Sequence, residues 1–240
     1  KLILWEVSKD ISFNKILRKG TITTEISRDN TIAVELTELE ENQKLYYRFS
    51  NKEDKAISVI GETITFPENA SSVKLAVCSC SNYQAGLFNV YNAMAKSEAD
   101  VIVHLGDYFY EYGAGGYGSN AQNASLNRSH KPAKEILTLD DYRTRYKQYR
   151  SDADLQLAHQ KKPFICVWDD HEVANDAYKE GAENHQANEG SYETRKQNAL
   201  QAYSEFLPFS RLEANNQMLI YRNFNLGNLV NLTMLDTRII

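Results

Sequence analysis

The chain has 240 residues and a formal net charge of -5. Hydrophobic residues make up 42% of it and charged residues 25%, which are values of an ordinary globular protein and exclude a disordered, collagen-like or coiled-coil chain. No run of about 18 apolar residues occurs, so no transmembrane segment is predicted. The acidic balance also provides no evident patch for binding nucleic acid. A chain of this length is expected to form one or two domains.

The first 67 residues alternate short apolar runs with polar breaks. Period-2 spacing and β-branched residues are typical of strands that have one buried face. The pattern predicts a small all-β sandwich of the immunoglobulin or fibronectin type III kind over residues 1–70. The predicted strands cover residues 2–7, 21–26, 31–36, 45–49 and 57–66.

The pattern changes after residue 70, where nearly continuous apolar runs alternate with segments of helical spacing. Such runs are typical of strands buried on both faces, and strand–helix–strand order predicts a parallel sheet. We therefore expect an α/β domain over residues 71–240. Its predicted strands are 73–78, 101–105 and 164–168, and its hairpin joins 218–226 to 229–235. Its predicted helices are 86–97, 138–158 and 191–207, with Thr138 or Asp140 as the N-cap of the second and Ser191 at the start of the third.

Polar residues with ligand chemistry follow each of the three predicted parallel strands. Ligands of parallel α/β sheets bind beyond the carboxyl ends of the strands, where these residues would meet. Several negative groups in one crevice repel one another unless cations lie among them. Carboxylate and amide oxygens suit Ca, Mg or Mn, whereas thiolate and phenolate favour a more polarising transition metal, so two unlike metals are predicted. The candidates are Cys80 and Asn82, then Asp107 and Tyr110, and finally Asp170 and His171.

Other features near these motifs have plainer interpretations. The Gly/Asn/Ser-rich segment 113–129 is expected to be a surface loop close to the strand ends. Tyrosines at helical spacing within 142–149 predict a helix that packs aromatic rings under the site, while Arg143 reaching a phosphate is the less favoured alternative. His104, inside a strand, is expected to be a structural or supporting histidine, and His130 is assigned to the surface.

Two motifs resemble those of the calcineurin-like metallophosphoesterases. Gly106-Asp107-x-x-Tyr110 resembles the GDxxY motif, and 169–172 (DDHE) resembles the GNHE block with Asp in place of Asn. The longer sequence around these motifs and the segments 141–146 and 235–238 resemble the PhoD-type alkaline phosphatases. The resemblance implies a metallophosphoesterase-type β-sandwich with flanking helices, preceded by an immunoglobulin-like N-terminal domain.

The same resemblance implies a binuclear or trinuclear metal centre, with Fe3+ and Ca2+ as the expected metals and Mn, Zn or Mg as alternatives. Cys80 and Tyr110 would bind the ferric ion, Asp107 would bridge the metals, and Asp170 would bind the calcium-type position. Asn82 is a further candidate ligand. His171 would face the phosphate, and both His171 and Asp107 are predicted to be catalytic.

The implied function is the hydrolysis of phosphate monoesters or diesters by metal-activated water. Two alternatives stay open, namely a truncated, non-catalytic module and a phosphodiesterase for phospholipids or wall polymers. The family implies a periplasmic, cell-surface or secreted protein, and the oligomeric state is left open. Further metal ligands are expected from later strands, but no GH or GHxH-like block follows Glu172, so the C-terminal part of the domain is expected to be missing.

Overall fold

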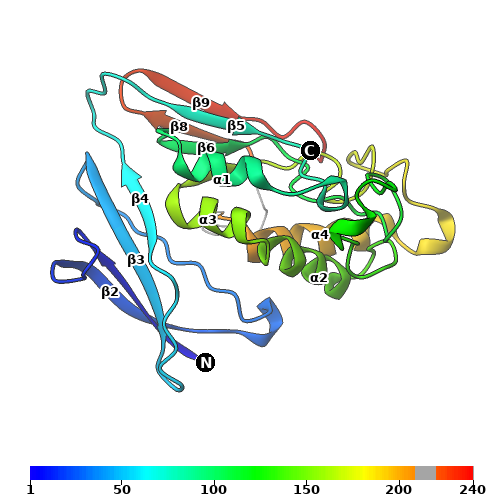
Figure 1. Ribbon diagram of the computed structural model, residues 1–240, viewed down its shortest axis with the longest axis horizontal. Helices are drawn as coiled ribbons and strands as arrows, with labels where there is room; N and C mark the ends of the chain where they lie inside the picture. Colours follow the sequence, from blue (N-terminus) through cyan, green and yellow to red (C-terminus); the bar gives the residue numbers. More distant parts are fainter. Residues whose placement is uncertain (209–219, 240) are drawn as a thin grey trace.

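The computed structural model describes residues 1–208 and 220–239. Figure 1 shows an N-terminal sheet on the left, a group of helices in the centre and on the right, and further strands along the top of the molecule. These parts form a mixed α/β architecture, as the sequence predicts. Among the described residues, no helix is both long enough and apolar enough to cross a membrane.

The N-terminal sheet is antiparallel, with the strand order β2-β1-β3-β4. The predicted strand over 31–36 is wrong, because these residues form no regular structure. Left-handed backbone at Asp29 (φ 52°) and Asn30 (φ 58°) turns the chain out of the sheet just before this segment, so it has no strand to pair with. Residues 1–67 thus form one four-stranded sheet where the sequence predicts two. Its strands are β1 (Leu2–Ser8), β2 (Ile16–Thr23), β3 (Gln43–Asn51) and β4 (Gly61–Thr65).

The second sheet is parallel and has the order β5-β6-β7, which confirms the predicted strand–helix–strand unit. Every residue of the central strand β6 is buried, as its continuous apolar run predicts. The predicted C-terminal hairpin is also present, although residues 218 and 219 of its first arm lie outside the described residues. The elements are β5 (Leu75–Cys78), α1 (Asn89–Lys96), β6 (Val101–His104), β7 (Phe164–Cys166), β8 (Arg222–Leu226) and β9 (Val230–Met234).

The predicted helix over 138–158 is two helices, α2 (Leu139–Arg150) and α3 (Ala153–Lys161). The break lies at Asp152, whose carboxylate accepts hydrogen bonds from the first amides of α3 and pairs with Arg128 at 2.7 Å. Because an N-cap residue has extended backbone, this cap starts a new helix and ends the previous one. Thr138 caps α2, as predicted. The fourth helix, α4 (Tyr192–Phe206), begins after its predicted cap, Ser191.

The core of the α/β region is rich in tyrosine. Tyr142, Tyr146 and Tyr149 on α2 are fully buried and pack around Phe109, which confirms the aromatic helix predicted under the site. The assignment of His130 to the surface is wrong, since its ring lies 3.2 Å from the Tyr149 hydroxyl and 2.8 Å from the carbonyl oxygen of Tyr112. The chain returns beneath the 113–129 loop at this point, and a ring with two internal partners can be buried there.

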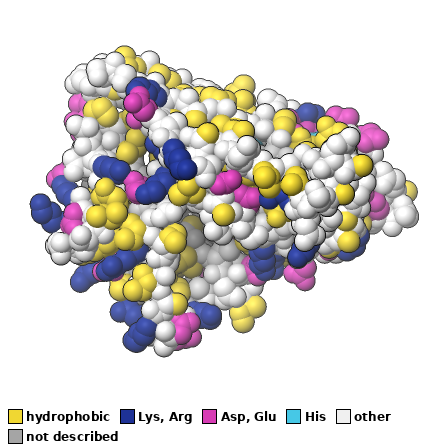
Figure 2. Space-filling model, viewed as in Figure 1, with side chains coloured by type: hydrophobic (Ala, Val, Ile, Leu, Met, Phe, Trp, Pro, Cys, Tyr) yellow, Lys and Arg dark blue, Asp and Glu magenta, His cyan; other side chains and the backbone are white. Residues whose placement is uncertain are grey.

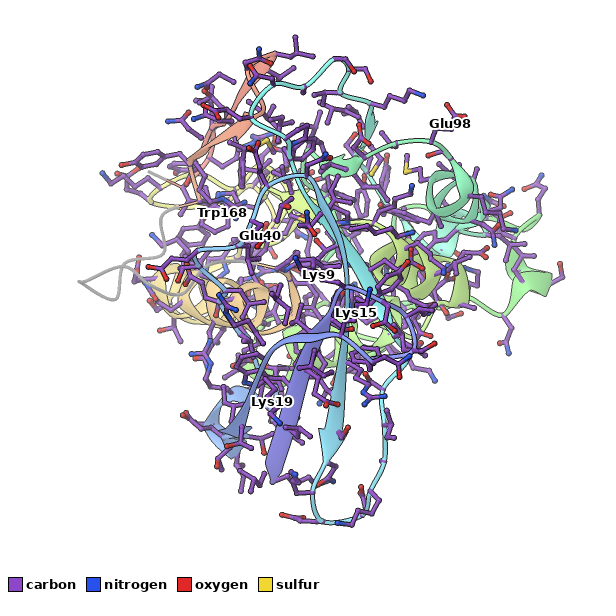
Figure 3. All side chains as sticks on the ribbon, turned by 90° about the vertical axis from the view of Figure 1, so that its left-hand side faces the viewer. Lys9, Lys15, Lys19, Glu40, Glu98 and Trp168 are labelled. Atoms are coloured by element: carbon purple, nitrogen blue, oxygen red, sulfur yellow. The ribbon has the colours of Figure 1, made fainter. Side chains whose placement is uncertain are left out.

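Polar groups join the N-terminal sheet to helix α3. Lys161 on α3 lies 2.5 Å from Glu62 on β4, and the Gln160 amide donates to the carbonyl of Ile60. On the side away from these contacts, Figure 3 shows Lys9, Lys15 and Lys19 along the sheet and its turns. Figure 2 shows charged side chains spread over the same part of the molecule.

Candidate metal centre

The site begins at a turn that follows β6, where two left-handed residues bring the chain against the loop after β7. Gly106 has φ 108°, and a Cβ at this position would lie 2.3 Å from the backbone nitrogen of Asp169. Asp107 follows with φ 53°, a conformation that is uncommon for a residue other than glycine. The close approach of the two loops therefore requires glycine at 106 and sets the position of Asp107 beside residues 169–171.

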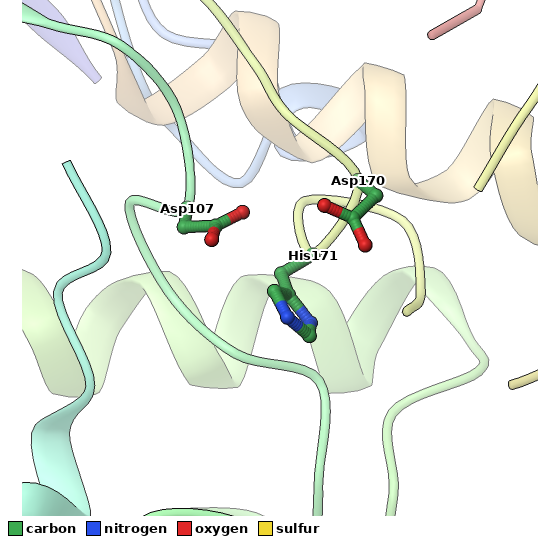
Figure 4. A group of neighbouring side chains, drawn as sticks. All are labelled: Asp107, Asp170 and His171. Atoms are coloured by element: carbon green, nitrogen blue, oxygen red, sulfur yellow. The ribbon is translucent and has the colours of Figure 1, made fainter. Parts of the chain in front are cut away.

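Three of the predicted residues, Asp107, Asp170 and His171, form a buried group. One ligand atom from each lies within 4.8 Å of the others, and Figure 4 shows their side chains converging from the loops after β6 and β7. Carboxylates and imidazole at this spacing are suited to holding a metal ion. The structure thus brings together the ends of the second and third parallel strands, as the sequence predicts.

Cys80 and Tyr110 meet the same carboxylate. The Cys80 sulfur lies 3.4 Å from Oδ2 of Asp107, and the Tyr110 hydroxyl donates to this oxygen at 3.3 Å. The other oxygen of Asp107, Oδ1, is buried and has no hydrogen-bond partner. Asp107 therefore has a thiol and a phenol at one oxygen, while Asp170 and His171 lie close by.

Asn82 has a different environment. Its Oδ1 accepts a hydrogen bond from the backbone of Gln84, and its Nδ2 donates to the carbonyl of Tyr117 at 3.1 Å. The amide thus holds the 113–129 loop against the segment after β5, which confirms that this loop lies near the strand ends. Its assignment as a metal ligand stays a prediction.

The electrostatics of Asp107 fit a bound cation. Burial raises the pKa of its carboxyl group, and the nearby carboxylates of Asp170 and Asp169 raise it further, against the opposing effect of His171. A buried acidic group with a raised pKa and an oxygen without a partner is costly for the fold. A cation would remove this cost, so the residues present fit a metal centre.

His171 is held by an acidic partner. Its Nδ1 lies 2.7 Å from Oε2 of Glu111, whose other oxygen accepts from the backbone of Asn175 and from the Asn184 amide. Burial works to lower the pKa of His171, but the hydrogen bond and charge of Glu111, together with the charges of Asp107 and Asp170, outweigh burial, and the pKa is raised. The contact also leaves Nε2 as the nitrogen available to a ligand or substrate.

Glu172 connects the two loops that carry the site. Its buried carboxylate accepts hydrogen bonds from the backbone amides of Tyr108 at 2.6 Å, Asp169 at 2.8 Å and Asp107 at 3.1 Å. Burial raises its pKa to about 8, although the three amides act in the opposite direction. Glu172 thus fixes the backbone from which Asp107 and Asp170 project.

His104 supports the turn from below, as the sequence predicts for a structural histidine. Its Nδ1 accepts from the backbone of Gly106 at 3.3 Å, and its Nε2 lies 3.1 Å from the Ser81 hydroxyl and 2.9 Å from that of Tyr91. Burial lowers its pKa to about 3, so the ring is neutral at physiological pH. The loops after β5 and β6 are therefore joined through one neutral imidazole.

Sequence reasoning assigned no role to three residues that the structure places at the site. Glu111 and Glu172 lie within the quoted motifs, each a short step from a predicted ligand, but nothing in a single sequence says which way their side chains point. Arg238 lies far along the chain, and its guanidinium is 2.6 Å from Asp169 and 3.3 Å from Asp170. The only signal for Arg238 is that it ends the family string at 235–238.

A parallel sheet with acidic, imidazole, thiol and phenol groups beyond its strand ends fits a metal-dependent phosphatase. Residues 75–240 match the family model of the PhoD-like phosphatases, and residues 2–67 match the model of their N-terminal domain. The chain belongs to the PhoD-like phosphatase family.

Two relatives show how far this similarity extends. Alkaline phosphatase D of Bacillus subtilis (strain 168) is 42% identical over 241 residues, a match that covers 98% of this chain and 40% of the relative. A solved structure of PhoD matches with a TM-score of 0.88 and 41% identity, covering 99% of this chain and 45% of the other. The chain thus spans less than half the length of both relatives.

Proposed function

We propose that the protein containing this chain hydrolyses phosphate esters with metal-activated water, as an alkaline phosphatase or phosphodiesterase. One observation carries the proposal, namely that the buried Asp107 meets a thiol and a phenol at Oδ2 and keeps Oδ1 without a partner beside Asp170 and His171. This arrangement fits a carboxylate shared by two unlike cations. The membership in the PhoD-like phosphatase family supports the same reaction class.

The family resemblance supports Fe3+ at Cys80, Tyr110 and Asp107, and Ca2+ at Asp107 and Asp170, with Asn82 as a further ligand. The donor chemistry agrees, because thiolate and phenolate favour a more polarising transition metal and carboxylate and amide oxygens suit Ca. Bound metals would neutralise phosphate oxygens and lower the pKa of a bound water toward about 7. Mn, Zn or Mg are the alternatives that elemental analysis would distinguish. The family resemblance supports export to the periplasm, the cell surface or the medium.

The residues of the chain would act on the substrate in distinct ways. His171, whose pKa is raised through its contact with Glu111, would lie beside the phosphate and in its protonated form donate a proton to the leaving oxygen from Nε2. Asp107 would keep Cys80 and Tyr110 at a fixed separation from Asp170, because Glu172 and His104 hold the backbone turn that carries Asp107. Arg238, which is charged and partly exposed beside Asp170, would add positive charge at the edge of the metal centre.

The test uses Asp107→Asn in the full-length protein. Asparagine keeps the size of the side chain but removes the charge, so we expect turnover of p-nitrophenyl phosphate and bis(p-nitrophenyl) phosphate to fall by at least about 100-fold, together with the metal content. In the metal-free protein the melting temperature should not fall, since a buried carboxyl group with a raised pKa is removed. Asp140→Asn, which changes an exposed carboxylate at the start of α2, is the matched control.

The outcomes separate the candidate functions. Full turnover and full metal content in Asp107→Asn would exclude the shared-carboxylate assignment. A wild-type protein that binds no metal and turns over neither ester would instead favour the non-catalytic module. The ratio of the two ester rates in the wild type decides between monoester and diester preference.

A further inference from the structure

Four aromatic rings form a continuous cluster that runs from the metal centre to the surface. The Tyr110 and His171 rings lie 4.2 Å apart between centroids, and the Tyr112 ring lies 5.7 Å from that of His171. Tyr117 completes the cluster, with its ring 5.5 Å from Tyr110 and 5.7 Å from Tyr112. The innermost member, Tyr110, is also the one that donates to Asp107. The cluster therefore touches the reacting groups at one end.

The outer end of the cluster is open to solvent. Tyr110 is 5% exposed, whereas Tyr117 is 62% exposed and Tyr112 lies between them. A tyrosine ring exposed to water lacks the favourable free energy of burial that the core tyrosines of this protein have. Tyr112 and Tyr117 thus form a partly exposed aromatic wall beside the metal centre, and we call this pair the tyrosine wall.

The loop that carries Tyr117 is held in place. Asn82 donates to the carbonyl of Tyr117, and the next residue, Gly118, has φ 88° and passes so close that a Cβ would lie 2.3 Å from the Asn82 amide. The buried Gln84 side chain donates to the carbonyl of Gly113 and accepts from the amide of Gly115. Because these contacts tie the loop to the segment after β5, the exposed ring is presented at a defined position.

We propose, on the basis of the proposed function, that the tyrosine wall binds the leaving group of the substrate and favours phosphate esters of aromatic alcohols. A phosphate held beside Asp107 and His171 would lie near these two rings, because Tyr112 packs against His171 and Tyr117 packs against Tyr110. A flat aromatic group can stack on or meet the edge of a tyrosine ring, while a short aliphatic alcohol covers little of it. Tyr117 is thus a specificity-determining residue, which acts on the leaving group and leaves the phosphate to the metal centre.

Binding of non-hydrolysable analogues tests this proposal without depending on turnover. Benzylphosphonate carries an aromatic ring at the position of the leaving group, and ethylphosphonate carries a short aliphatic chain there. We would measure both dissociation constants by isothermal titration calorimetry on the metal-loaded, full-length protein, for the wild type and for Tyr117→Ala, Tyr117→Phe and Ile26→Ala. Ile26→Ala is the control, because it removes an apolar side chain that is 85% exposed in the N-terminal region.

We expect Tyr117→Ala to weaken benzylphosphonate binding roughly three- to tenfold and to leave ethylphosphonate binding unchanged. Tyr117→Phe, which keeps the ring, and the Ile26→Ala control should both bind like the wild type. Equal weakening of both analogues, or no weakening of either, would overturn the proposal. Rates with phenyl phosphate and glycerol 3-phosphate then complete the test, since a wild type that binds both analogues but hydrolyses neither ester contradicts the proposed function alone.

Discussion

The N-terminal sheet and the α/β region differ in the side chains that they bury. Over residues 1–67 the buried apolar side chains are few, namely Val7, Phe13 and Leu45, and most strand residues are half-exposed. The α/β region contains nearly all of the remaining buried apolar residues and, in addition, a set of buried acids. The buried acids around the metal centre are Asp107, Glu111, Asp170 and Glu172.

This difference shows where function is located in the molecule. Burial of an acidic group is unfavourable unless hydrogen bonds or opposite charges compensate it, so four such groups close together need specific partners. The α/β region compensates them with backbone amides, His171 and Arg238. The N-terminal sheet has no such cluster among its residues, which are all described, and its contacts with the helices include an ion pair and a hydrogen bond. The N-terminal sheet is therefore a unit that packs against the region that carries the site.

The largest effect on stability is expected from Glu172→Ala. This change leaves three backbone amides without an acceptor, and each buried donor without a partner costs about 1–3 kcal/mol. We expect the free energy of unfolding to fall by roughly 3–9 kcal/mol, measured by urea denaturation of the full-length protein.

Glu172→Gln is the matched variant for this measurement. The glutamine amide oxygen can still accept a hydrogen bond, but its NH2 group faces a backbone donor. The free energy of unfolding should therefore fall less than in Glu172→Ala. The comparison between the two regions would fail if Glu172→Ala had no effect, because the buried acid would then contribute nothing to the site backbone.

The next largest effect is expected from Arg143→Ala. The guanidinium makes two 2.8 Å hydrogen bonds to the fully buried Glu205 and a third to the carbonyl of Ser27 in the N-terminal region. Removal of Arg143 leaves a buried carboxylate short of its cation, which should cost about 3 kcal/mol. Because Arg143 is committed to this contact, the KM for phosphate esters should not change. A large rise in KM with unchanged stability would restore the alternative that Arg143 binds phosphate.

The fold could be predicted where local signals and packing agree. The continuous apolar runs identified β5, β6 and β7, and the caps Thr138 and Ser191 marked where α2 and α4 begin. The errors arose where one pattern fits two structures. Residues 31–36 have the alternation of a strand, but a strand also needs a neighbour, and the left-handed turn at Asp29 and Asn30 removes it. The break at Asp152 was missed because a helix cap inside a helical pattern resembles an ordinary surface acid.

The site was predictable as a set of residues but less so as an arrangement. The rule that ligands gather at the carboxyl ends of parallel strands placed Asp107, Asp170 and His171 together. This rule does not predict where the side chains that support these three residues point. The roles of Glu111 and Glu172 are therefore known only from their hydrogen bonds in the structure. The pairing of Arg238 with Asp170 depends on the return of the chain after β9, which no local pattern encodes.

A smaller and pH-dependent effect is expected from Glu111→Gln. The Glu111 carboxylate raises the pKa of His171 above its ordinary 6.5, so the stabilisation is fully present below about pH 6.5 and is lost as the pH rises through the folded-state pKa. We expect the variant to lose about 1 kcal/mol at pH 5.5 and clearly less at pH 9.

NMR titration of His171 in the metal-free protein provides the direct measurement for Glu111→Gln. The pKa of His171 should fall, while Asp107 and Asp170 keep part of the upward shift. Asp140→Asn is the control, because it removes an exposed charge that has no contact with the ring. An unchanged His171 pKa would show that Glu111 only positions the ring.

The smallest effect should come from Lys161→Met, which probes how the N-terminal sheet is docked. Lys161 is partly exposed and shares Glu62 with Lys44, so its loss leaves the carboxylate with a second cation. Pairs of this kind contribute about 0–1 kcal/mol, and the contribution should disappear in 1 M salt because the charges are screened. Thermal unfolding at low and high salt measures both quantities. A salt-independent loss above about 2 kcal/mol would mean that the sheet is an integral part of the α/β core, and the contrast between the two regions would have to be abandoned.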